Sequence, residues 1–183
     1  MSRQPLIVGL GGTARAASTS ERALRVALDQ AARLGCATQV FGGPELPKEF
    51  YSVETSERSP HARALVEALR AADGVIVASP GYHGSVSGLV KNALDYAEDL
   101  RRDARPYLEG RAIGLIVTAD GPQALGSTLA ALRSIAHALR GWPTPYGALI
   151  NTSVSGDGPD QLAPAEIVAR QVCEFVLRAA AQP

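Results

Sequence analysis

The chain has 183 residues, 46% of them hydrophobic, and its 18 lysines and arginines are balanced by 18 acidic residues. This length predicts one globular domain over residues 1–183. The zero net charge gives no support for binding to nucleic acid or to an anionic membrane, and no apolar run reaches the roughly 20 residues of a membrane span. The N-terminus lacks a signal-peptide pattern, so we expect a cytoplasmic protein.

Two cysteines, Cys36 and Cys173, stand far apart in the sequence and form no CxxC motif. This spacing indicates neither a zinc site nor a disulfide framework. Both side chains are expected to be buried, unreactive thiols, and no metal site is predicted.

Strand-like and helix-like stretches alternate from the beginning of the chain. The apolar run at 6–10 is typical of a parallel strand that is covered on both faces. An amphipathic helix is predicted over 20–35, with Ser20 as its N-cap. A second strand follows at 36–41. Residues 42–60 are irregular and rich in Pro, Gly, Ser and Glu, and a flap is one interpretation of them.

The second half of the chain continues this alternation. Helices are predicted over 61–73, from 86 onward, over 124–141 and over about 162–180, and strands over 74–79, 111–119 and 145–151. Five strands alternating with helices predict an α/β fold with a parallel sheet covered on both faces. Right-handed crossovers favour a doubly wound open sheet, since a barrel would need eight such units. Ligands of such sheets bind beyond the carboxyl ends of the strands.

The loop after the first strand, GGTARAASTSE (11–21), combines small residues, hydroxyls and one arginine. Hydroxyls and free backbone N–H groups at a helix N-terminus form an anion site, and Arg15 can add a charged hydrogen bond to a phosphate. The hydroxyl residues are Thr13, Ser18, Thr19 and Ser20. A solvated loop in which Ser20 only caps the helix is the alternative interpretation.

The stretch GLGGTA at 9–14 also fits the dinucleotide fingerprint G-x-G-x-x-A. Polar residues delay the helix, however, and the second strand does not end on an acid, so we reject that interpretation. A P-loop is excluded because no GK[ST] follows. A monophosphate held mostly by hydroxyls fits the loop best.

The stretch SPGYHGSVSGLVKNALDYA (79–97) joins an apolar strand to a helix. A flat, partly apolar ligand needs close backbone approach, which glycines permit, together with a rigid edge or a ring. The residues predicted to border this ligand are Pro80, Gly81, Tyr82, His83 and Gly84, with Ser85 as the cap of the next helix. Asp120–Gly121, after the fourth strand, is predicted to offer backbone N–H groups to the same ligand. His83 is equally compatible with an ordinary surface residue.

With these motifs the chain resembles the NAD(P)H-dependent FMN reductases, whose flavodoxin-like fold has five strands in the order 2-1-3-4-5. Their first loop has a small residue, Ser or Thr, a spacer, Arg, and hydroxyl or amide residues, an order that GGTARAASTSERAL follows. Their second motif, Pro-x-Tyr-x-Gly-Ser before a helix with Lys-Asn and Asp, is matched by SPGYHGSVSGLVKNALDY. The similarity extends from residue 6 to about 151.

The resemblance implies roles for individual residues. Thr13, Arg15, Ser18 and Ser20 would hold the FMN phosphate. The stretch from Pro80 to Ser85, and the backbone around Asp120 and Gly121, would border the isoalloxazine ring. The family often has a Gly-Gly pair where this chain has Asp120–Gly121–Pro122, which leaves the details of the third loop open.

The resemblance also implies an oxidoreductase that transfers a hydride from NADPH or NADH to FMN, with no further catalytic side chain required. Reduced flavin would pass to a partner monooxygenase or to a small acceptor. Similar enzymes reduce quinones, azo dyes and chromate, and such proteins are commonly homodimers or homotetramers. A flavodoxin-type electron carrier is the main alternative, although such carriers tend to be acidic and this chain is neutral.

Overall fold

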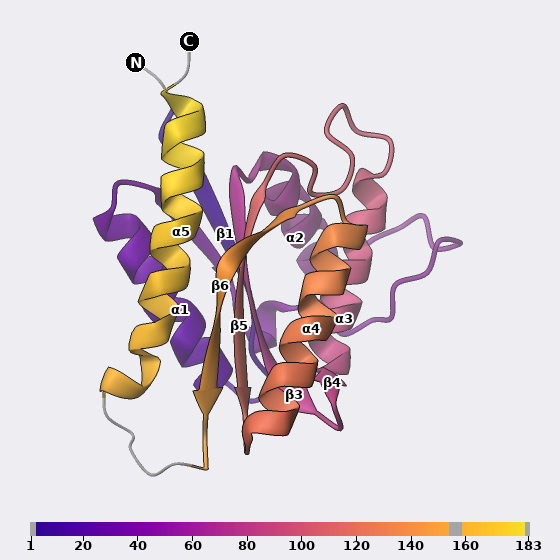
Figure 1. The fold of residues 1–183 in the computed structure, drawn as a ribbon. Helices are drawn as coiled ribbons and strands as arrows, with labels where there is room; N and C mark the ends of the chain where they lie inside the picture. The colour runs from indigo at the N-terminus through magenta and orange to yellow at the C-terminus, as the bar shows by residue number, and fades with distance from the viewer. Residues whose placement is uncertain (1–2, 154–158, 182–183) are drawn as a thin grey trace.

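The computed structural model describes residues 3–153 and 159–181, in which helices cover both faces of a central sheet (Figure 1). The strands of the parallel sheet are β1 (Leu6–Gly11), β2 (Ala37–Phe41), β3 (Gly74–Tyr82), β5 (Ala112–Ala119) and β6 (Trp142–Asn151). The α-helices are α1 (Thr19–Arg33), α2 (Pro60–Ala71), α3 (Gly88–Asp95), α4 (Pro122–Ala138) and α5 (Ala163–Ala180). Short 3-10 helices are η1 (Gly43–Glu45), η2 (Tyr96–Leu100) and η3 (Pro159–Leu162).

The strands lie in the order β2-β1-β3-β5-β6, and each neighbouring pair is parallel. Numbered along the chain as predicted, this is the order 2-1-3-4-5, so the doubly wound α/β fold is confirmed. The short strand β4 (Ser85–Val86) was not predicted. It pairs antiparallel with the end of β3, which runs to Tyr82 and not to the predicted residue 79.

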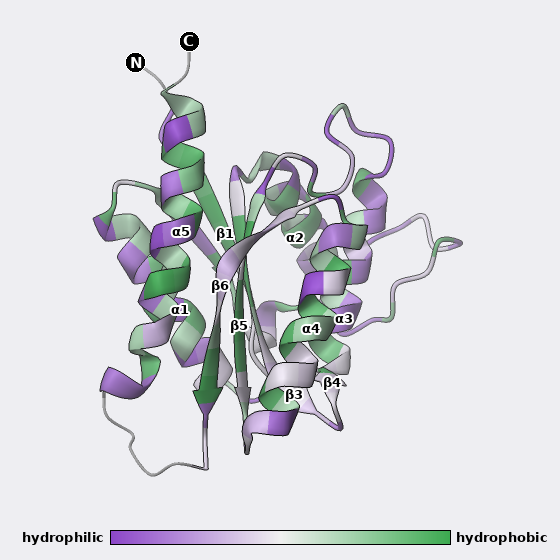
Figure 2. Ribbon diagram, viewed as in Figure 1, coloured by the Kyte–Doolittle hydropathy of each residue, from purple (hydrophilic) through white to green (hydrophobic). Residues whose placement is uncertain are grey.

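Two apolar layers hold the fold together, one on each face of the sheet (Figure 2). Helices α1 and α5 cover one face, and α2, α3 and α4 cover the other. Along β3 the side chains alternate between the layers: Ile76 lies in the α1–α5 layer, and Val75 and Val77 lie in the opposite one. All eight residues of β5 are buried. This is expected of a central parallel strand, whose sequence is a nearly continuous apolar run because both faces are covered.

Two helix caps differ from the predictions. The N-cap of α1 is Ser18, whose Oγ accepts the N–H of Glu21 at 3.4 Å, while Ser20 lies inside the helix. The N-cap of α3 is Ser87, whose Oγ accepts the N–H of Val90 at 3.2 Å. Ser85 was the wrong choice because it belongs to β4, where it pairs with Tyr82.

The two cysteines are buried, as predicted, and their Sγ atoms lie 3.5 Å apart. Burial raises the pKa of both thiols, that of Cys173 to about 12. Among the described residues, His, Cys, Asp and Glu form no group of three that could hold a metal ion. Within the same ranges, none of the helices has the length and apolarity to cross a membrane.

Candidate functional site

The three predicted loops meet at the carboxyl edge of the sheet, after β1, β3 and β5. They share a cavity of about 450 Å³. Its lining residues are Thr13, Arg15, Ser18, Thr19, Ser20, Pro80, Gly81, Tyr82, Thr118, Ala119, Asp120, Ala124 and Thr152. Gly84 and Gly121 line an adjoining hollow of about 560 Å³, which also includes Asp120 and Ala124. His83 and Ser85 line neither of these two spaces.

Hydrogen bonds between neighbouring residues stabilise the β1–α1 loop, residues 12–18. The Oγ1 of Thr13 accepts the N–H of Arg15 at 3.2 Å and lies 3.1 Å from the Arg15 carbonyl, to which it donates. Ser18 and Ser20 are buried, and their hydroxyl oxygens are 3.3 Å apart. Arg15 is exposed, and within the described part of the chain its guanidinium pairs with no carboxylate. The loop therefore presents one positive charge and several hydroxyls to the cavity.

The turn after β2 also packs closely against the β1–α1 loop. A Cβ atom on Gly43 would lie 1.5 Å from the carbonyl oxygen of Thr13, so only glycine permits this approach of the two backbones. On the other side, the N–H of Gly12 donates to the carbonyl of Ala78 at 3.1 Å. These contacts hold the beginning of the loop against β3 and the turn after β2.

The second loop is a tight hairpin between β3 and β4. Tyr82 pairs with Ser85, which leaves His83 and Gly84 as the two turn residues. Their φ angles are +50° and +86°, the signs that a type I′ hairpin turn requires. Gly84 thus meets a conformational need of the turn, and the Tyr82 side chain beside it is half exposed at the cavity.

Gly81 has a packing role in addition to its place in the cavity wall. A Cβ atom there would lie 2.8 Å from Thr128 Oγ1 on α4 and 3.2 Å from the Ala119 side chain. The glycine therefore lets the end of β3 close against α4 and β5. The sequence had suggested close approach of a ligand as the reason for this glycine, and helix packing accounts for it as well.

The third loop is oriented by residues at the end of β6, which sequence analysis missed. The Thr152 hydroxyl donates to an Asp120 carboxylate oxygen, and the amide oxygen of Asn151 accepts the N–H of Gly121 at 3.3 Å. Gly121 has a φ of +113° and is the N-cap of α4. The signal was available, because 151–152 is itself the carboxyl end of a parallel strand, where ligand-site residues are expected.

Glu21 is a second residue that the sequence analysis missed. Its carboxylate is buried beneath the β1–α1 loop and accepts hydrogen bonds from the Ala17 N–H at 3.1 Å and from Arg25. Ser18 and Glu21 match the capping-box pattern S-x-x-E, which would have identified both the true N-cap and this carboxylate.

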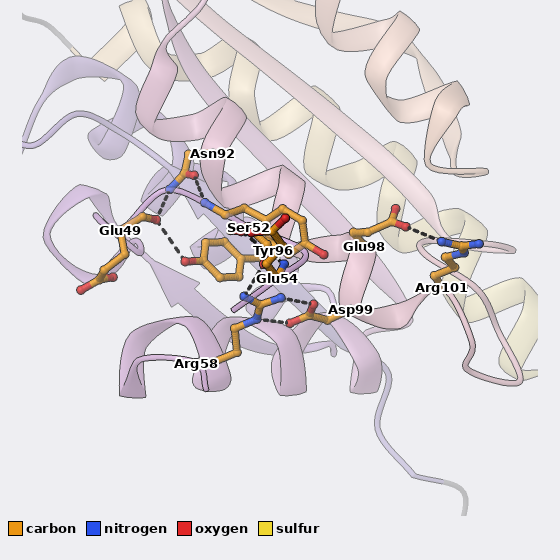
Figure 3. Close-up of polar contacts among 10 residues, drawn as sticks. Glu49, Ser52, Glu54, Arg58, Asn92, Tyr96, Glu98, Asp99 and Arg101 are labelled. Atoms are coloured by element: carbon orange, nitrogen blue, oxygen red, sulfur yellow. Dashed lines mark hydrogen bonds and ion pairs between the residues drawn. The ribbon is translucent and has the colours of Figure 1, made fainter. Parts of the chain in front are cut away.

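Residues 42–60, for which a flap was one interpretation, are anchored to the body of the protein (Figure 3). The Nδ2 of Asn92 donates to the carbonyls of Pro47 and Glu49 at 3.1 and 2.9 Å, and its Oδ1 accepts the N–H of Tyr51 at 2.9 Å. The Tyr96 hydroxyl donates to the Glu49 carbonyl at 3.0 Å. We call residues 47–58 the anchored segment.

A cluster of charged and aromatic side chains fixes the C-terminal end of the anchored segment to η2. The Arg58 guanidinium binds both carboxylate oxygens of Asp99 at 2.8 and 2.7 Å and donates to the Ser52 carbonyl at 3.0 Å. Its carbon atom Cζ also lies 4.7 Å from the ring centre of Tyr51 and 5.4 Å from that of Tyr96. Two apolar side chains of the segment, Phe50 and Val53, are left exposed.

Comparison with known proteins agrees with this fold and with the sequence motifs. The model of a family described as NADPH-dependent FMN reductase matches residues 5–154. An FMN-dependent NADPH-azoreductase of Staphylococcus aureus is 40% identical over 81 residues, which are 44% of this chain and 39% of that protein. The match therefore spans well under half of the relative's length.

Solved structures at low sequence identity have the same fold. The apo form of an NADH:FMN oxidoreductase superposes with a TM-score of 0.67 at 19% identity, covering 98% of this chain and 92% of the other. A flavodoxin, WrbA-like protein from Agrobacterium tumefaciens has a TM-score of 0.70 at 16% identity, with 96% and 99% covered. At these identities the likeness establishes a flavodoxin-like fold and nothing further.

Proposed function

Because the chain belongs to the NADPH-dependent FMN reductase family, we propose that it is an NAD(P)H:FMN oxidoreductase that holds FMN at the carboxyl edge of its sheet. FMN and NAD(P)H are the expected cofactors of a member of this family. The observation that carries the proposal is the single cavity shared by the β1–α1 loop, the β3–β4 hairpin and the loop after β5.

The donor groups of the cavity fit FMN. The β1–α1 loop offers clustered hydroxyls and the guanidinium of Arg15, which pairs with no carboxylate among residues 3–153 and 159–181, a set suited to a phosphate. The neighbouring strand end offers a proline, a glycine and a half-exposed tyrosine, a set suited to a flat ring. The order of the strands in the sheet, β1 beside β3 beside β5, supports a ligand that lies across all three strand ends.

We assign the FMN phosphate to Thr13, Arg15, Ser18 and Ser20. The ring would lie against Pro80, Gly81 and Tyr82, with Gly84, Asp120 and Gly121 at the adjoining hollow. His83 and Ser85 lie beyond both spaces, and their contact with the ring stays a prediction.

Bound FMN supplies the acceptor for the hydride of the reduced nicotinamide. The protein residues bind and orient the flavin. Arg15 neutralises the phosphate, and the turn at His83–Gly84 holds the end of β3 in place. The Asp120 carboxylate is kept in position by Thr152.

A second candidate function is reduction of azo compounds with FMN as a resident cofactor. It is favoured by the similarity to the FMN-dependent NADPH-azoreductase of Staphylococcus aureus. An electron carrier of the flavodoxin type is the third candidate, and the balanced charge of 18 basic against 18 acidic residues counts against it. The proposal covers both NADPH and NADH as hydride donors. A homodimer or homotetramer, a monooxygenase partner and a cytoplasmic location stay predictions.

The deciding experiment uses protein purified without added flavin. FMN is supplied in increasing amounts while the absorbance of NADPH or NADH is followed, with and without an azo dye. Nucleotide oxidation that rises and saturates with FMN supports the reductase, and dye bleaching by a preloaded protein supports the azoreductase. If FMN binds but neither nucleotide is oxidised, even with a quinone present, the proposal fails and the carrier takes its place.

A further inference from the structure

The buried Glu21 carboxylate lies beneath the β1–α1 loop and binds it at one point. Its Oε2 accepts the N–H of Ala17 at 3.1 Å. Its Oε1 accepts two hydrogen bonds from Arg25, at 3.1 Å from Nε and 2.8 Å from Nη2. Glu21 is only 4% exposed, whereas the Arg25 side chain that binds it is about half exposed.

Ala17 has an unusual backbone conformation, with a φ of +54°. The left-handed region is unfavourable for a residue with a Cβ atom, and an alanine side chain has no polar group of its own to stabilise it. The hydrogen bond from the Ala17 N–H to Glu21 is therefore a specific restraint on this turn. Ala17 stands between Arg15 and the N-cap Ser18, so its conformation sets how the two are placed relative to each other.

The surroundings of Glu21 leave the carboxylate little freedom to move. A Cβ atom on Gly42 would lie 2.9 Å from Oε1, and one on Gly12 would lie 3.2 Å from the Glu21 Cβ. The two glycines thus enclose the side chain. The ion pair with Arg25 offsets part of the negative charge of Glu21 near the anion site.

We propose that Glu21 is a positioning residue for the phosphate of FMN: it holds Ala17 in the left-handed conformation and thereby fixes Arg15 and Ser18 toward the cavity. This inference rests on the proposed function, because it takes the cavity to be the FMN site. Glu21 itself does not touch the phosphate, and its effect passes through the backbone of the loop.

The test compares FMN with riboflavin, which has the same ring and no phosphate. Affinities are measured by flavin fluorescence for the wild type, Glu21→Ala, Glu21→Gln and the control Glu166→Ala. Glu166 is a matched control because it also lies in the first turn of a helix, and it pairs with Arg33 at 3.0 Å. Thermal unfolding of each variant verifies that it is folded.

For Glu21→Ala we expect the Kd for FMN to rise at least tenfold while the Kd for riboflavin stays within twofold. Glu21→Gln should be affected in the same selective way but less, because its amide oxygen can still accept the Ala17 N–H. It becomes the deciding variant if the alanine variant does not fold, with at least a twofold selective loss expected. Glu166→Ala should leave both affinities unchanged.

Two results would overturn the inference, and they are distinguishable from failure of the proposed function. If the wild type prefers FMN over riboflavin and the Glu21 variants keep that preference, the positioning role is wrong and the FMN site stands. An equal loss of affinity for FMN and riboflavin would likewise mean that Glu21 has only a structural role. If the wild type has no preference for FMN, the phosphate site itself fails, and the inference fails with it.

Discussion

Two irregular segments of this protein each carry one arginine among serine and threonine residues, and the two arginines have opposite uses. The β1–α1 loop is made mostly of small residues, whereas the anchored segment also contains acidic, aromatic and apolar side chains. In the β1–α1 loop, Arg15 and the hydroxyls line a cavity. In the anchored segment, Arg58 and three backbone positions bind to Asn92, Tyr96 and Asp99 on α3 and η2.

The difference arises from the residues that face each segment and not from the segments themselves. Arg58 meets the carboxylate of Asp99 and two aromatic rings, so its charge is used inside the protein. Arg15 meets no carboxylate in the described residues, so its charge is available to a ligand. A loop rich in polar residues is therefore a candidate site only where the rest of the fold leaves these groups without partners. Four predictions test this contrast.

The largest expected effect is on stability, for Asn92→Ala. The substitution removes three hydrogen bonds to the backbone of the anchored segment. At about 1 kcal/mol each, their loss should lower the free energy of unfolding by about 3 kcal/mol, measured by urea denaturation. FMN affinity of the folded variant should stay within twofold of the wild type.

Lys91→Ala is the control for that variant. Lys91 is the neighbouring residue, and its ion pair with Asp95 is about half exposed, so its loss should cost less than about 1 kcal/mol. A stability loss for Asn92→Ala no larger than that of Lys91→Ala would mean that the segment is not anchored in solution.

The next largest effect is on binding, for Arg15→Ala. Loss of a charged hydrogen bond to phosphate, worth roughly 1.5–3 kcal/mol, should raise the Kd for FMN by roughly ten- to a hundredfold. The free energy of unfolding should change by less than about 0.5 kcal/mol, because Arg15 is exposed. The control is Arg101→Ala, which removes an exposed arginine paired with Glu98. Unchanged FMN affinity in the Arg15 variant would contradict the assignment of the loop to the phosphate.

A smaller loss of stability is expected for Arg58→Lys. Lysine keeps the charge but loses the two-point contact with Asp99 and the stacking on Tyr51. We expect a decrease of about 1 kcal/mol in the free energy of unfolding, together with faster proteolysis within the anchored segment. Arg101→Lys, on an exposed one-point pair, should change neither quantity. Equal behaviour of the two variants would show that the Arg58 cluster contributes only its charge.

The order of the sheet could be predicted from the sequence because the signals were strong and local. The apolar runs at 74–79 and 111–119 lie in β3 and β5, the central strands, and these are buried from both faces. Handedness rules then left few arrangements of the sheet. The cavity was predictable for a related reason, since its loops follow from strand order once the strands are known.

The exact helix caps were harder to predict, because two serines of similar capping ability stand near the beginning of each helix and a periodic pattern does not distinguish them. Ser18 and Ser20 are both good caps by composition, and the Glu21 contacts favour the first. Ser85 and Ser87 differ only because the hairpin at His83–Gly84 takes up Ser85. The contacts of Asn92 with the anchored segment join residues more than 40 positions apart, and no local pattern reports them.

The smallest effect, visible only at alkaline pH, concerns the tyrosines that face the anchored segment. Burial raises the pKa of Tyr96 and of Tyr51, with nearby carboxylates adding to the effect and Arg58 opposing it. In the unfolded chain these phenols lose their protons near pH 10, while the folded protein keeps them to higher pH. The free energy of unfolding should therefore fall as the pH rises above about 10.

Tyr96→Phe isolates the contribution of one phenol to this pH dependence. The two buried thiols titrate in the same range, but they are common to the variant and the wild type, so the difference between the two proteins reports Tyr96. Between about pH 9 and 11, urea denaturation should show a shallower loss of stability in the variant. At neutral pH the variant should be slightly less stable, because its hydrogen bond to the Glu49 carbonyl is gone. Identical pH dependence in both proteins would mean that Tyr96 is solvated in solution and that the anchored segment does not cover it.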